Sequence, residues 1–88
     1  MPDYRIELTS QAERGLRQIA KGEPALYVRV VQTINDLGHD PFQGKALKGE
    51  LKGRYSYRVG SYRIVYAIQH RELLIIIIDV GHRKGIYR

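Results

Sequence analysis

The stretch YSYRVGSYRIVY, residues 55–66, predicts two short antiparallel strands joined by a tight Gly60-Ser61 turn. In this register Arg58 pairs directly with Arg63, and the period-two alternation of a strand sorts the side chains onto two faces. The face expected to pack against the helices carries Tyr55, Tyr57, Val59, Tyr62, Ile64, Tyr66 and Ile68. The opposite face carries Arg54, Ser56, Arg58, Arg63, Val65 and Ala67. The hairpin therefore has an apolar side and a basic side.

The two facing arginines indicate a phosphate-binding function. Like charges directly opposite each other in a sheet are destabilising, by something under about 1 kcal/mol when they are solvated. An anion that bridges both guanidinium groups would reverse this effect, because the fork of an arginine matches the oxygens of a phosphate. The alternative is that both side chains splay into water.

The sequence before the hairpin predicts a strand and two helices. Residues 4–8 (YRIEL) alternate as a strand does, and the sequence SQAE at residues 10–13 fits a capping box that opens a helix. This helix is expected over about residues 10–21. A second helix is expected to begin at Pro24, with Gly38 and Pro41 ending it. The apolar stripes of the two helices are Ala12, Leu16, Ile19 and Ala20, and Leu26, Val30, Ile34 and Leu37.

The rest of the chain predicts a long loop and a three-stranded meander. Residues 38–53 hold four glycines and three lysines without sustained periodicity, which is typical of a basic loop. Strands are expected at residues 54–59, 62–68 and 73–80, with the apolar run in the last of them as a central strand. All 88 residues are then one α+β domain of order β-α-α-β-β-β. Its small, mostly antiparallel sheet carries the two N-terminal helices on one face.

The charge of the chain is concentrated in its second half. Residues 1–44 contain five Lys/Arg and six Asp/Glu, a net charge of −1, whereas residues 45–88 contain ten and three, a net charge of +7. A partner rich in phosphate would explain this asymmetry. A solvated surface that keeps a small protein soluble is the alternative reading.

Composition narrows the setting in which the protein works. The chain has no cysteine, which excludes a disulfide framework and thiolate chemistry and is compatible with a reducing cytoplasm. The N-terminus lacks the layout of a signal peptide. The longest apolar run, residues 73–78, is far shorter than the roughly 20 residues that cross a bilayer. We expect a soluble, cytoplasmic protein without a membrane partner.

The C-terminal sequence GHRKGIYR, residues 81–88, adds further polar groups. These are His82, Arg83, Lys84, Tyr87 and Arg88. In a meander the end of the third strand returns toward the Gly60-Ser61 turn, so the regions of Arg63 and Arg83 should meet. The set offers fixed cations, a phenol and an imidazole but no carboxylate cluster of the kind that holds a metal. It suits metal-free cleavage of RNA by the 2′-hydroxyl group, and it suits RNA binding equally well.

The sequence LKGELKGRYSYRVGSYRIVY, followed by a hydrophobic strand and GHRKGIY, resembles the RelE/ParE superfamily of toxins from type II toxin–antitoxin pairs. The resemblance implies a RelE-like fold over nearly the whole chain. RelE-like members enter the ribosomal A site and cut mRNA there, leaving a 2′,3′-cyclic phosphate, and a cognate antitoxin silences them. ParE-like members share the fold but poison DNA gyrase.

The resemblance also implies roles for individual residues. The superfamily arginine in the Tyr-Arg-hydrophobic-Val-Tyr strand falls on Arg63, and the arginine after the last strand falls on Arg83. The tyrosine near the C-terminus falls on Tyr87. Of two basic residues before the turn, the second falls on Arg58, but the first falls on Ser56. The residue expected to act as general base is therefore absent from its usual position.

Other residues are expected to complete the site. His82 or Tyr87 would assist proton transfer, and Lys48, Lys52 or Arg54 would supply the missing cation. Contacts to the RNA backbone are expected from Lys45, Lys48, Lys52, Arg54, Lys84 and Arg88.

Taken together, these observations predict a toxin that is a ribosome-dependent mRNA endonuclease and uses neither a metal nor another cofactor. Its expected partners are a cognate antitoxin, the ribosome with its mRNA, and operator DNA only through the antitoxin complex. A gyrase inhibitor without nuclease activity is the first alternative. A degenerate member that only binds its antitoxin and operator DNA is the second.

Overall fold

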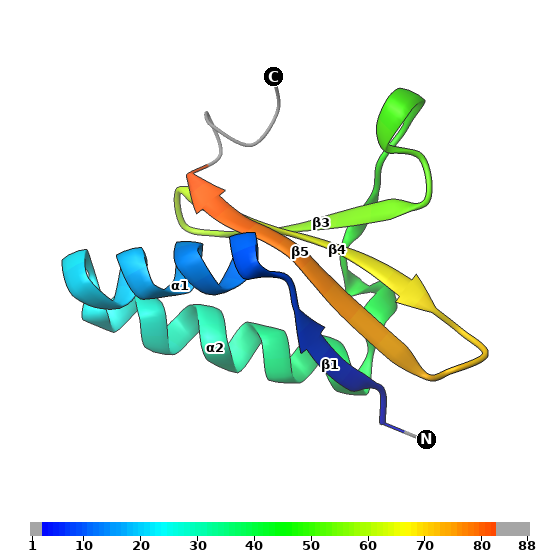
Figure 1. The fold of residues 1–88 in the computed structure, drawn as a ribbon, viewed down its shortest axis with the longest axis horizontal. Helices are drawn as coiled ribbons and strands as arrows, with labels where there is room; N and C mark the ends of the chain where they lie inside the picture. The colour runs from blue at the N-terminus through cyan, green and yellow to red at the C-terminus, as the bar shows by residue number, and fades with distance from the viewer. Residues whose placement is uncertain (1–2, 83–88) are drawn as a thin grey trace.

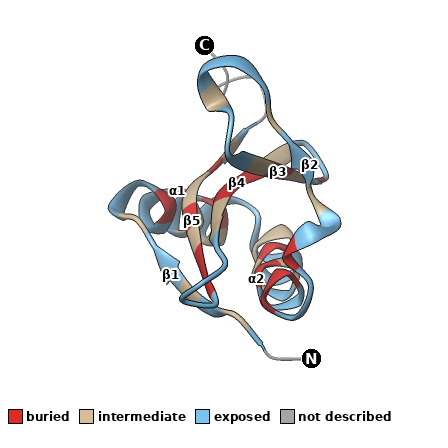
Figure 2. Ribbon diagram, turned by 90° about the vertical axis from the view of Figure 1, so that its right-hand side faces the viewer, coloured by how far each residue is buried: buried red, intermediate tan, exposed pale blue. Residues whose placement is uncertain are grey.

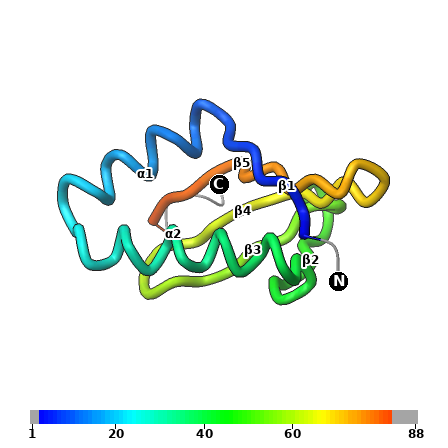
Figure 3. Tube along the Cα trace, turned by 90° about the horizontal axis from the view of Figure 1, so that it is seen from below, coloured from blue at the N-terminus to red at the C-terminus, as the bar shows by residue number. Residues whose placement is uncertain are grey.

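The computed structural model describes residues 3–82, which form a five-stranded sheet with two helices on one face (Figure 1). The elements are β1 (Arg5–Leu8), α1 (Ser10–Gly22), α2 (Pro24–His39), η1 (Pro41–Gln43), β2 (Lys45–Ala46), η2 (Gly49–Leu51), β3 (Arg54–Val59), β4 (Tyr62–Gln69) and β5 (Leu74–His82). The sheet order is β1-β5-β4-β3-β2, and only the β1–β5 pair is parallel. The two helices run side by side in opposite directions across the sheet (Figure 3). The predicted α+β fold is confirmed.

Helix α1 begins differently from the prediction. Its N-cap is Thr9, whose Oγ1 accepts a hydrogen bond from the Ala12 amide at 3.1 Å, so the capping box expected at Ser10 was placed one residue too late. The same Thr9 hydroxyl donates to the Ile78 carbonyl of β5 at 2.6 Å. One threonine therefore both starts the helix and ties it to the sheet.

Helix α2 begins at Pro24 as predicted but does not end at Gly38. The helix includes Gly38 and ends at His39, where the Asp40 amide donates to the Asp36 carbonyl at 3.0 Å. A Cβ on Gly38 would lie 3.1 Å from Ile6, and the Gly38 carbonyl accepts from the Tyr4 amide at 2.8 Å. This glycine allows the strand to approach the helix closely instead of ending it.

The expected long basic loop over residues 38–53 contains short elements that the sequence did not predict. Two short 3₁₀ helices and the two-residue strand β2 occupy part of it, with Lys45 opposite Ser56 and Ala46 opposite Tyr55. The buried Tyr66 hydroxyl holds the segment before β2, because it donates to the Pro41 carbonyl at 2.7 Å and accepts from the Gly44 amide at 3.1 Å. A strand of two residues is too short to show periodicity in the sequence.

The central hairpin has the predicted register. Its six pairs run from Arg54 opposite Ala67 to Val59 opposite Tyr62, and Gly60 has a φ of 60°, which favours glycine. The last strand differs from the prediction at both ends, since it spans Leu74–His82. Leu73 precedes it with a φ of 50°, a left-handed conformation that is incompatible with a strand.

The core lies between the helices and the adjacent face of β3, β4 and β5 (Figure 2). Its largest fully buried side chains are Tyr66, Ile19, Leu37, Ile64, Ile75, Ile77, Val30 and Val80. Helix α1 lies directly on the backbone of β5, since a Cβ built on Gly15 would be only 2.0 Å from the Val80 carbonyl oxygen. None of the helices within residues 3–82 combines the length and the apolar character needed to cross a membrane.

Candidate nucleic-acid interface

A row of residues crosses three strands on the sheet face opposite the helices. Arg58 of β3 pairs with Arg63 of β4, and Arg63 pairs in turn with Gly81 of β5. Arg58 is exposed and Arg63 is half-buried. The β5 strand thus returns beside Arg63, as the meander predicted, and the predicted neighbour Arg83 lies outside the described residues.

Ser56 lies on the same sheet face as Arg58 and Arg63 and contacts Arg63. Its side chain is only 4% exposed, and Arg63 Nη1 donates to its Oγ at 3.4 Å. This distance exceeds the roughly 2.7–3.2 Å of an ordinary N–H···O hydrogen bond, so the contact is weak and mainly orients the guanidinium. Where the superfamily pattern leads us to expect a cation, this chain has a small buried hydroxyl beneath Arg63.

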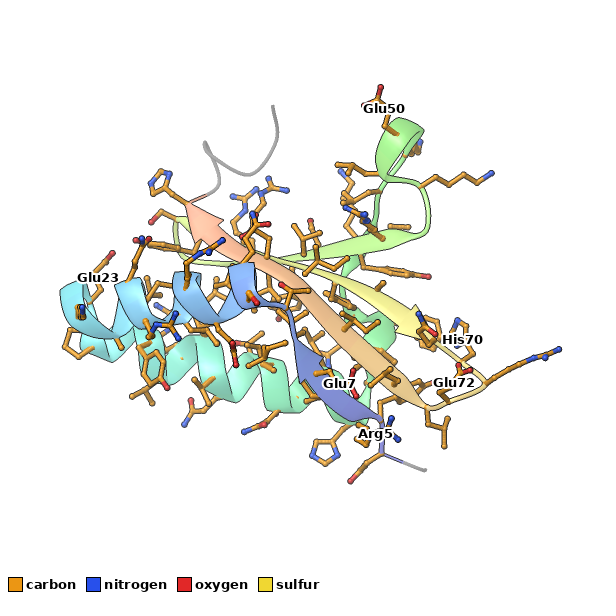
Figure 4. All side chains as sticks on the ribbon, viewed as in Figure 1. Arg5, Glu7, Glu23, Glu50, His70 and Glu72 are labelled. Carbon is orange, nitrogen blue, oxygen red and sulfur yellow. The ribbon has the colours of Figure 1, made fainter. Side chains whose placement is uncertain are left out.

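The lysines expected to contact RNA lie on the same side of the molecule. Lys45 is exposed on β2 and pairs with Ser56, which places it on the basic face. Lys48 and Lys52 flank η2 and are also exposed. The η2 segment rises from the sheet on the side away from the helices, with Glu50 at its tip (Figure 4). Arg54, exposed at the start of β3, completes the basic face with Arg58 and Arg63.

His82 lies on the other face of the sheet. It pairs with Tyr62, and the two rings meet edge to face with centroids 5.6 Å apart. The Tyr62 hydroxyl donates to Glu23 Oε2 at 3.1 Å, at the corner between the two helices. The structure therefore brings His82 together with Tyr62 and Glu23, and it does not bring the imidazole together with the arginine row.

The hydrogen bond to Glu23 raises the pKa of Tyr62 above its ordinary value of 10.0, with smaller contributions from burial and from the carboxylate charge. Tyr62 is thus held in its neutral form. No sequence pattern indicates this cluster of Glu23, Tyr62 and His82, because its members come from the α1–α2 turn, β4 and β5.

Four predicted site residues lie outside the described residues. They are Arg83, Lys84, Tyr87 and Arg88, and their roles stay predictions.

Within residues 3–82 no three His, Asp or Glu side chains gather in a way that would hold a metal ion. The described part of the site offers guanidinium and ammonium groups around a buried hydroxyl, an arrangement that can bind phosphate and stabilise added negative charge.

Comparison with known proteins identifies the family of this chain. The family described as the ParE toxin of type II toxin–antitoxin systems, parDE, matches residues 6–87. Toxin RelG of Mycobacterium tuberculosis is 36% identical over 87 residues, covering 97% of both chains. Toxin RelE of the same organism is 34% identical over 86 residues, covering 97% of this chain and 87% of the other. The chain therefore belongs to the ParE toxin family of type II toxin–antitoxin systems, and the resemblance found in its sequence is confirmed.

Solved structures show the same fold. The crystal structure of the toxin–antitoxin complex RelBE2 from Mycobacterium tuberculosis contains a chain with a TM-score of 0.83 and 35% identity, covering 94% of both chains. The archaeal RelE–RelB complex from Pyrococcus horikoshii gives a TM-score of 0.73 at 24% identity, covering 97% of this chain and 99% of the other.

Proposed function

We propose that this toxin is a ribosome-dependent endoribonuclease that cuts mRNA in the A site without a metal ion. The observation that carries the proposal is the row formed by Arg58, Arg63 and Gly81, since it pairs two arginines across neighbouring strands on the sheet face opposite the helices, beside the end of β5. Like charges directly opposite each other in a sheet repel, and an anion bound between them would relieve this repulsion. A scissile phosphate is an anion of suitable shape.

The chemistry follows from the charge that develops during cleavage. The 2′-hydroxyl loses its proton and attacks the adjacent phosphorus, the bond to the 5′-oxygen breaks, and that oxygen takes up a proton as it leaves. The products are a 2′,3′-cyclic phosphate and a 5′-hydroxyl. Arg63, oriented by Ser56, and Arg58 would stabilise the extra negative charge of the transition state.

Proton transfer is assigned to the chain end rather than to the described strands. The proposal gives His82 no direct part in it, because its side chain lies on the helix-facing side with Tyr62. Tyr87 remains the proposed proton-transfer group and Arg83 a third cation, both beyond the described residues. Lys45, Lys48, Lys52 and Arg54 would contact the RNA backbone without reading its sequence.

The proposed protein partner is a cognate antitoxin that covers the basic face. Two similar chains were solved as toxin–antitoxin complexes, which supports this partner. Operator DNA would be bound only through that complex. Inhibition of DNA gyrase is the second candidate function, because the matching family is named for ParE.

Cleavage and gyrase inhibition are separated by one paired assay. Purified toxin is added to ribosomes that hold a defined codon in the A site, mRNA ends are mapped by primer extension, and the same toxin is tested on gyrase supercoiling. We expect wild-type protein to cut, and Arg63→Gln to cut at least about a hundredfold more slowly. Arg71→Gln is the matched control, since this exposed arginine lies in the distant β4–β5 turn between His70 and Glu72 (Figure 4). Inhibited supercoiling without any cut would replace the nuclease proposal with the gyrase one.

A further inference from the structure

A polar groove of about 280 Å³ lies between α1 and the end of β5, outside the arginine row. Its lining residues are Gln11, Arg14, Gly15, Gln18, Asp79, Val80 and Gly81. Its volume is close to the lower limit of roughly 300 Å³ for pockets that bind small ligands. The groove is thus large enough for one small planar group.

The helix presents a polar stripe to this groove. Gln11, Arg14 and Gln18 are spaced by three and four residues, so they follow one side of α1. The close contact between Gly15 and the Val80 backbone holds that side of the helix against β5. The groove is therefore built by backbone packing, and its polar side chains do not depend on a loop for their position.

The groove adjoins the proposed phosphate site through β5. Gly81 lies directly opposite Arg63, and Asp79 lies opposite Val65, two residues along the same face. Because residue 81 is a glycine, it places no side chain between Arg63 and the groove. A nucleotide whose phosphate lies on Arg63 can thus extend past Gly81 toward Asp79.

The groove has a different chemistry from the basic face. Asp79 Oδ2 accepts a hydrogen bond from Gln11 Nε2 at 2.9 Å. A carboxylate is unfavourable beside a phosphate, but it accepts hydrogen bonds from the amino groups of bases, as Asp and Glu do from cytosine N4. The Gln18 side-chain amide adds an NH2 donor group and a carbonyl acceptor to the lining, and Arg14 adds a cation. This set matches the edge of a base and not the sugar–phosphate backbone.

We propose that the groove is a base-binding subsite for the nucleotide adjoining the scissile phosphate, with Asp79 accepting from the exocyclic amino group of that base. Adenine, cytosine and guanine carry such a group and uracil does not, so the subsite selects against uracil. The role of this subsite in cleavage rests on the proposed nuclease function. The affinity of the groove for an amino-bearing base is a separate property that the isolated protein has.

Direct binding tests the subsite without the ribosome. The ¹⁵N-labelled full-length toxin is titrated with CMP and with UMP, and the side-chain amide signals of Gln11 and Gln18 are followed. We expect CMP to shift both signals and to bind about tenfold more tightly than UMP. Asp79→Asn should abolish this preference, because an amide presents a donor where the carboxylate accepts. Glu7→Gln is the matched control, since Glu7 is exposed on β1 and lines no part of the groove (Figure 4). Equal binding of CMP and UMP by wild type would overturn the proposal.

The cleavage assay then tests the role of the subsite. Ribosomes are programmed with A-site codons that differ only in the base next to the cut. Wild type should cut the mRNA about tenfold faster when this base carries an amino group than when it is uracil, and Asp79→Asn should cut both at the same rate. If wild type cuts nothing while CMP still binds, the nuclease proposal fails and the groove remains a base site. If Asp79→Asn weakens antitoxin binding and leaves the preference between bases unchanged, the groove is an antitoxin contact and the proposal is wrong.

Discussion

Replacing Gly15 with alanine is expected to destabilise the protein, although alanine is the better helix former. The added Cβ would lie 2.0 Å from the Val80 carbonyl oxygen and 3.0 Å from its carbon, and both are backbone atoms that cannot rotate away. Helix α1 must therefore move off β5 and loosen the core around Ile19. Overpacking of this kind costs about 1–3 kcal/mol or more, whereas the gain in helix propensity is only about 1 kcal/mol. A contact of 2.0 Å with backbone belongs to the upper part of that range, about 2–3 kcal/mol, so we expect a net loss of about 1–2 kcal/mol.

The measurement is thermal and urea unfolding of Gly15→Ala beside Gly22→Ala. Gly22 ends the same helix, and a Cβ built on it meets nothing within 4 Å, so its replacement reports propensity alone. A net loss of this size lowers the Tm of a domain of this length by roughly 4–16 °C. We expect the Gly22 variant to be unchanged or slightly more stable. Equal stability of the two variants would refute the reasoning that α1 rests on the β5 backbone.

Three further results are expected on the hairpin and on the residue that anchors β2. Arg58→Gln should raise the free energy of unfolding by up to about 1 kcal/mol at low salt, because it removes the charge facing Arg63. Added salt should reduce this gain. A loss of stability in urea unfolding would contradict the paired register. Tyr66→Phe should lower the free energy of unfolding by about 1–3 kcal/mol, because the Pro41 carbonyl and the Gly44 amide lose their buried partner; an unchanged urea midpoint would argue against it. Burial raises the pKa of Tyr66 from 10.0 to about 12. The stability that the neutral phenol supplies is therefore complete below pH 10 and is lost as the pH rises through 12. An equally steep loss of stability with pH in Tyr66→Phe would contradict this.

Much of the fold was predictable because the decisive signals are local. The Gly60-Ser61 turn set the register of six strand pairs, and alternation around it assigned every hairpin side chain to a face. The position of Arg63 beside the end of β5 followed from the meander alone. These features depend on short-range backbone geometry, which the sequence encodes directly.

The features that sequence reasoning missed depend on contacts between distant segments. Strand β2 exists because the buried Tyr66 hydroxyl holds residues 41–44, a contact across more than twenty residues. His82 was expected near the arginines, but its side chain faces Tyr62, since its side of the sheet depends on the register between β4 and β5. The groove beside Gly81 likewise forms only once Gly15 packs on β5.

The most direct test of the central claim is the chemistry of the cut end. Ribosomes with a filled P site and an open A-site codon are incubated with the toxin, and the upstream mRNA fragment is analysed by mass spectrometry. We expect a fragment ending in a 2′,3′-cyclic phosphate, with a yield that falls at least about a hundredfold in Arg63→Gln. A fragment ending in a 3′-hydroxyl, or a yield unaffected by that substitution, would contradict it.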